Sequence, residues 1–172
     1  MTAPTNSHMI RVRLVPGTTG AALHRAAANI PRRLYTLVRL ILEHDRTNTI
    51  QETPVGWSGQ LRSGYQVDVL RLPHGARGAL LNPTAHHDIR DQGRHAGRRP
   101  PVSALIPWVG SKLGIPEPAR TRVAFLVARK IGAKGYRGAH MVDKGWAKTL
   151  PEITPALAKL GWQIVSDIDS AP

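Results

Sequence analysis

The chain has 172 residues, a formal net charge of +13 and no cysteine. This length suits a single domain with a sizeable core, and we expect residues 1–172 to form one domain. The absence of cysteine excludes disulfides, zinc–thiolate sites and cysteine nucleophiles. Aromatic residues make up 5% of the chain, which indicates a modest, largely aliphatic core. The positive charge favours partners that carry phosphate or carboxylate groups.

The N-terminal residues and the hydropathy pattern bear on location. No apolar run approaches the length of a membrane-spanning helix, and residues 1–7 lack the apolar core of a signal peptide. We therefore expect a cytoplasmic origin and no membrane contact. Residues 1–8 are polar, and we expect them to form a flexible arm.

The first half of the chain predicts a strand, a long helix and a hairpin. Residues 10–14 alternate apolar and basic side chains, which is typical of a half-buried strand. Residues 18–45 place apolar side chains at steps of three and four, which predicts a helix; Pro31 predicts a kink or break within it. Residues 65–72 alternate again, and residues 79–81 can return as the partner strand after a turn of about six residues.

The second half predicts a loop followed by helices. Residues 83–101 show no periodicity, and we expect an extended basic loop there. Residues 102–114 and 116–135 predict two helices that end on glycine. Residues 150–168 predict an amphipathic helix that Thr149 would cap. Together these elements predict an α+β fold, in which a small antiparallel sheet packs against a long N-terminal helix and C-terminal helices.

The densest basic segment is the predicted loop. It contains Arg90, Arg94, Arg98 and Arg99 among glycines and prolines. Four arginines on a glycine-containing loop can meet phosphates without reading sequence, or can pair with carboxylates of a partner protein. The loop has no aromatic residue, which argues against stacking on single-stranded bases. Solvated faces of an arginine-rich protein would give the same composition.

Two other groups of residues resemble functional motifs. A hydrolase or metal site could use a cluster of metal-capable side chains, namely His86, His87, Asp88, Asp91 and His95. No nucleophile motif accompanies the cluster, and it lies in a predicted loop, so we expect no enzyme, metal or cofactor. The G-x-x-G pattern from Gly132 to Gly135 matches the phosphate-clamping loop of KH domains, but it also suits a helix C-terminus.

The segment T-P-V-G-W-S-G-Q-L-R-S at residues 53–63 carries a family resemblance. It resembles the T-P-V-(D/G)-x-(T/S)-G-x-L-R-x-S segment of neck or tail-completion proteins of long-tailed bacteriophages, which are often described as minor tail proteins. The order of later motifs is similar too: Gly-Arg and Pro-Pro within residues 93–101, a Trp-Val pair within 105–109, and an Ala- and Ile-rich helix that closes with Lys-Gly within 128–135.

The resemblance implies a structural role in the virion, without catalysis. Proteins of this family form a homo-oligomeric ring at the head–tail junction, between the head-closure (connector) protein and the tail terminator or tail tube, and the genome passes through the centre. They assemble in the host cytoplasm. We expect subunit contacts at Trp57, Leu61, Arg62 and Trp108, with Arg62 in an ion pair. The four loop arginines would then meet DNA or acidic partners.

The alternative is a free basic nucleic-acid-binding protein. Its charge alone would account for binding to duplex DNA, and such binding weakens steeply as salt rises. It would act as a monomer, and this separates it from a ring component.

Overall fold

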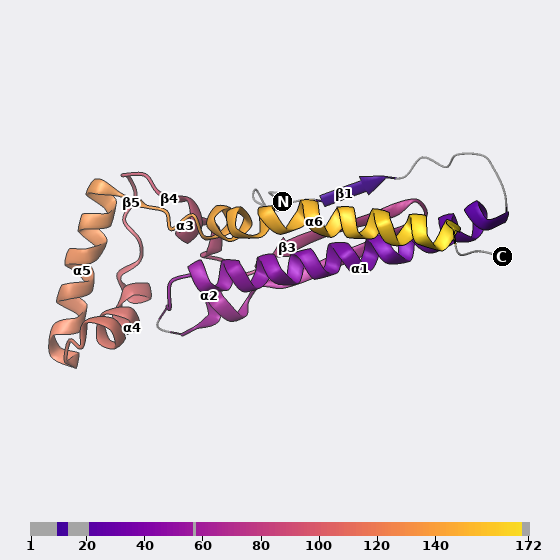
Figure 1. Cartoon of the computed structure of the whole chain (residues 1–172). Helices are drawn as coiled ribbons and strands as arrows, with labels where there is room; N and C mark the ends of the chain where they lie inside the picture. The colour runs from indigo at the N-terminus through magenta and orange to yellow at the C-terminus, as the bar shows by residue number, and fades with distance from the viewer. Residues whose placement is uncertain (1–9, 14–20, 57, 170–172) are drawn as a thin grey trace. The chain divides into compact units, whose positions relative to one another are not determined.

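The computed structural model describes residues 10–13, 21–56 and 58–169. The fold is α+β, as the sequence predicts (Figure 1). The chain divides into two compact units, and the single domain expected from the length stays a prediction. Unit 1 comprises Met1–Glu52, Tyr65–Asn82 and Val142–Pro172, and unit 2 comprises Thr53–Gly64 and Pro83–Met141. The predictions for the arm at residues 1–8, for the end of the first strand at residue 14, for the start of the first helix at residue 18 and for Trp57 lie outside the described residues.

Unit 1 contains a three-stranded antiparallel sheet. Its strands are β1 (Ile10–Arg13), β2 (Gln66–Leu72) and β3 (Gly75–Leu81), in the order β1-β3-β2. The register places Leu72 opposite Gly75, so the hairpin turn has two residues and the return strand starts earlier than predicted. The alternation of β3 was hidden in the sequence because Gly75, Ala76 and Gly78 carry no large side chain.

The long helix α1 (Ala21–Glu52) lies on this sheet. It continues through Pro31 and past the predicted end at Asp45, so a break at the proline is wrong. Packing outweighs the local cost of the proline, because Leu34, Val38 and Leu42 are at most 2% exposed. They form the core with further residues of unit 1, namely Tyr65, Ala76, Leu80 and Leu160.

A glycine lets the helix approach the sheet closely. A Cβ on Gly78 would lie 2.3 Å from Leu42 Cδ1 and 2.8 Å from Val38 Cγ1. Because Gly78 of β3 has no side chain, the side chains of α1 can occupy the space beside it.

The C-terminal helix α6 (Met141–Asp169) runs beside α1 (Figure 1). It starts before the predicted cap at Thr149, and this residue is fully buried inside the helix instead. Its Oγ1 donates a hydrogen bond to the Gly145 carbonyl at 3.1 Å and accepts one from Asn48 Nδ2 at 3.0 Å. A Cβ on Gly145 would lie 2.1 Å from Thr49 Oγ1. The absence of a side chain at Gly145 is what allows the two helices to approach each other this closely.

Unit 2 consists of short elements and two longer helices. They are α2 (Gln60–Ser63), α3 (His87–Gln92), β4 (Gly93–Arg94), α4 (Val102–Leu113), α5 (Glu117–Lys134) and β5 (Tyr136–Arg137). The two predicted helices with glycine ends are confirmed as α4 and α5, and Ala124 and Ala128 form the buried face of α5. The predicted loop at 83–101 contains α3 and β4, so it is not extended throughout. None of the helices in the described ranges is long and apolar enough to span a bilayer.

Candidate anion-binding surface

The two units differ in charge. Unit 2 holds half of the 24 Lys and Arg residues but only three of the 11 acidic residues. Each of these three carboxylates already has a partner: Asp88 lies 3.1 Å from His87 Nδ1, Glu117 pairs with Arg120 at 2.5 Å, and Asp91 accepts a hydrogen bond at 2.6 Å from the Met141 backbone N–H. The arginines of unit 2 therefore exceed the carboxylates available to them.

The arginine segment, residues 90–99, is held in place by backbone hydrogen bonds. Strand β4 pairs with β5, with Gly93 opposite Arg137. The Gly97 N–H donates to the Gly132 carbonyl at 2.7 Å, and the Ala139 N–H donates to the Arg90 carbonyl at 2.9 Å. The sequence predicted an extended loop here, but these bonds fix the backbone of the segment along the end of α5.

Glycines opposite the segment make this contact possible. A Cβ on Gly135 would lie 2.0 Å from the Arg94 carbonyl oxygen, and one on Gly138 would lie 2.1 Å from that of Asp91. A Cβ on Gly132 would lie 2.6 Å from Arg99 Cγ. The G-x-x-G pattern therefore ends a helix and packs against the arginine segment, which favours the helix C-terminus over the KH-type interpretation.

Three of the four predicted arginines are positioned by groups of unit 2. Arg90 Cζ lies 5.9 Å from the ring centroid of Tyr136, and Arg99 Cζ lies 6.0 Å from that of Phe125. Arg94 Nη2 donates to the Arg98 carbonyl. The Arg98 side chain is exposed and has neither a hydrogen bond nor an ion pair within the part of the chain that the structure describes.

The sequence missed the two aromatic partners. The arginine segment contains no aromatic residue, and Tyr136 and Phe125 come from β5 and α5, well beyond it in the chain. No local signal could have found them, because the contact exists only once the segment returns along α5.

The positioned arginine side chains can bind anions. A guanidinium held over an aromatic ring keeps its N–H groups available in its plane, and arginine remains charged at every physiological pH. Fixing the side chains in advance lowers the entropy lost on binding. We infer a preformed cationic surface that suits phosphate or carboxylate oxygens.

The predicted subunit contacts have mixed outcomes. Leu61 is 4% exposed, so it is not available on the surface. Arg62 Nε donates to the Thr53 carbonyl at 2.7 Å. No ion pair involves Arg62 among the described residues of this single chain, and an ion pair between Arg62 and a neighbouring subunit stays a prediction. Trp108 is half-buried on α4, and its place in a subunit contact stays a prediction.

The histidine cluster does not form a metal site. Within the described ranges, no group of three or more His, Cys, Asp or Glu side chains could hold a metal ion. Asp91 is fully buried and bonds the first N–H of α6, while His87 bonds its neighbour Asp88. Asp91 therefore holds the start of α6, whereas α3 begins without a side-chain cap.

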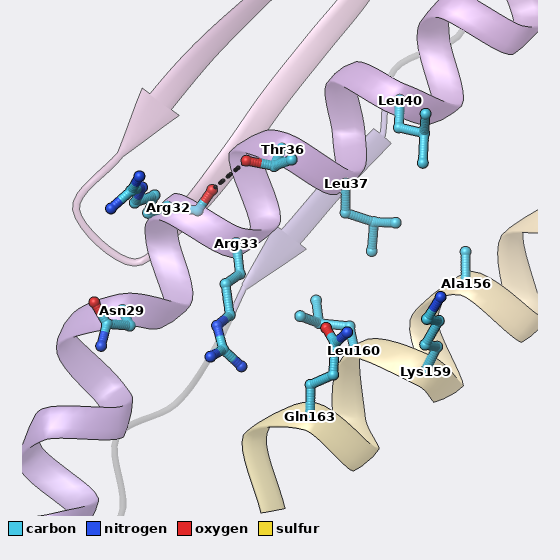
Figure 2. A pocket seen from close by; sticks show the side chains of 10 residues that line it. All are labelled: Asn29, Arg32, Arg33, Thr36, Leu37, Leu40, Ala156, Lys159, Leu160 and Gln163. Carbon is cyan, nitrogen blue, oxygen red and sulfur yellow. Dashed lines mark hydrogen bonds between the residues drawn. The ribbon is translucent and has the colours of Figure 1, made fainter. Parts of the chain in front are cut away.

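Unit 1 has a basic hollow of its own, which lies between α1 and α6. Its volume is about 530 Å³. Figure 2 shows Arg33 reaching from α1 toward Leu160 and Gln163 of α6. Arg32 and Lys159 also line it, and its lining contains no carboxylate.

Comparison of the chain with protein-family models, with curated proteins and with solved structures finds no match.

Proposed function

We propose that this protein is a structural component of the head–tail junction of a long-tailed bacteriophage, of the neck or tail-completion kind. One observation carries the proposal. Two separate stretches of the motif series, residues 93–101 and 128–135, are in direct contact, since the Gly97 N–H bonds the Gly132 carbonyl. The contact orients exposed arginines on a unit with few carboxylates, so the motifs that carry the resemblance also build the cationic surface.

The proposed role follows from this surface. Copies of the chain would form a ring between the connector and the tail, and the arginines would meet the DNA backbone or acidic groups of the neighbouring ring proteins. Phosphate contacts of this kind give affinity and carry no sequence information. A conduit for a whole genome needs such sequence-independent contact.

The experiment is to identify the protein in particles. Virions purified from a producing host would be analysed by mass spectrometry, and antibody labelling would be located by electron microscopy. We expect the chain in mature particles, with label at the junction of head and tail. Particles that lack it would overturn the proposal.

The same surface favours a second function, that of a free protein that binds nucleic acid. Light scattering on the purified chain with and without duplex DNA separates the two. The free protein would form no ring-sized oligomer and would bind DNA with a steep dependence on salt. A chain that ignores duplex DNA at moderate salt excludes this second function.

A further inference from the structure

Helix α6 presents an uncharged face to solvent. Its exposed residues on this face recur at helical spacing over about five turns. They are Ala147, Leu150, Pro151, Thr154, Pro155, Leu157, Ala158, Gly161, Trp162 and Val165. Trp162 is 75% exposed and Leu150 is 53% exposed. Leu160, by contrast, is 8% exposed and belongs to the core of unit 1.

The charged side chains of this part of α6 lie along one edge of the uncharged face. Lys148 pairs with Glu52 at 2.5 Å and Glu152 lies 2.6 Å from His44 Nδ1, so this edge adjoins α1. Lys159 follows on the same edge, seven residues after Glu152. The uncharged face therefore has a charged border, on which the acidic Glu152 is followed by the basic Lys159 toward the C-terminal end of the helix.

The charge of the chain restricts what can cover this face. Two copies that each carry +13 repel one another, and the repulsion is least where the contact surface itself bears no charge. The face also contains small residues that let another helix approach, and a Cβ on Gly161 would meet no atom within 4 Å.

We propose that the uncharged face of α6 binds the same face of a second copy, with the two helices antiparallel. In an antiparallel pair the same edges of the two helices meet. A register that places Thr154 opposite Leu157 of the second copy also places Glu152 opposite Lys159, twice by symmetry. The pair thus buries the apolar side chains and matches the charges on the edge.

The contact lies within unit 1 and does not rest on the proposed place in the virion. It is isologous, whereas a ring is closed by heterologous contacts. A failure of this proposal leaves the arginine surface and the virion experiment as they stand.

Sedimentation equilibrium of the full chain tests the contact. The unmodified chain should form dimers, and Leu157→Glu should weaken dimerisation about 100-fold or more, because two carboxylates would be buried in one interface. The matched control is Leu70→Glu, on β2 of the same unit, where the leucine is 59% exposed; it should change dimerisation less than about threefold. A monomeric unmodified chain, or equal effects of the two variants, would overturn the proposal.

The register has its own test, because the chain has no cysteine. Thr154→Cys and Leu157→Cys variants, mixed and oxidised, should yield mainly the mixed disulfide. A predominance of disulfides between identical variants would contradict the antiparallel register, and absence of any cross-link beside a folded circular-dichroism spectrum would contradict the contact.

Discussion

Unit 1 and unit 2 are each stabilised internally, but by different kinds of contact. Unit 1 joins long helices through side chains: an aliphatic core, and the fully buried polar residues Asp45, Thr49 and Thr149 between α1 and α6. Unit 2 joins short elements through backbone contacts at glycines, with its arginines left at the surface. The difference indicates that the stability of unit 1 depends on the charge of its buried polar residues, whereas unit 2 tolerates added side-chain volume poorly at a few glycines.

The largest effect should come from Gly135→Val in unit 2. Gly135 has φ 63° and ψ −158°, a conformation that suits almost only glycine, and the added carbon would collide with the Arg94 carbonyl. We expect a loss of about 4 kcal/mol in the free energy of unfolding. Chemical denaturation measures this loss, and hydrogen exchange should show it in unit 2.

Gly56→Ala is the matched control, since a Cβ there would meet no atom within 4 Å. It should change stability by less than about 0.5 kcal/mol. Equal stability of the Gly135 and Gly56 variants would refute the idea that glycine contacts hold unit 2.

A smaller effect should follow from Asp45→Asn in unit 1. Burial raises the pKa of Asp45 to about 6, against a smaller lowering by the hydroxyl groups of Thr149 and Thr49. Between pH 4 and 6 the folded chain keeps a proton that the unfolded chain releases, so stability falls as pH rises through this window and stays low above it. The variant removes the charge and should be more stable than the unmodified chain by about 3 kcal/mol at pH 8.

The check is a series of urea titrations from pH 4 to pH 8. The advantage of the variant should disappear near pH 4, where the unmodified carboxyl is protonated in the folded chain. An advantage that is the same at both ends of the series would mean that the charge of Asp45 is not the cause.

The smallest effect should be that of single arginines on polyanion binding. Arg98→Ala or Arg99→Ala should each weaken binding to duplex DNA by about 1 kcal/mol and lower the slope of log K against log salt by about one. Arg39→Ala, an exposed arginine of α1 in unit 1, is the control and should leave both quantities unchanged. Equal losses for Arg39 and Arg98 would show that total charge, and not the surface of unit 2, governs binding.

The sequence predicted most of the elements because their signals are local. The helices that end at Gly114 and Gly135 and the hairpin after Tyr65 follow from periodicity and turn residues. The full extent of α1 and α6 could not be predicted from such local signals, because Pro31 and Gly145 are acceptable within these helices only through tertiary packing. The arginines of the candidate surface were found by composition, but their aromatic partners come from another part of the chain and left no pattern.

The pairing of α1 with α6 has a consequence for synthesis of the chain. The hydrogen bond between Asn48 and Thr149 joins residues 101 positions apart, and that between Thr149 and Asp45 joins residues 104 apart. Every element of unit 2 therefore leaves the ribosome before α6 can reach α1. A nascent chain must hold α1 and its sheet without their last partner until translation is nearly complete. A premature stop directly after residue 141 would release a protein with unit 2 entire and the polar side of α1 uncovered.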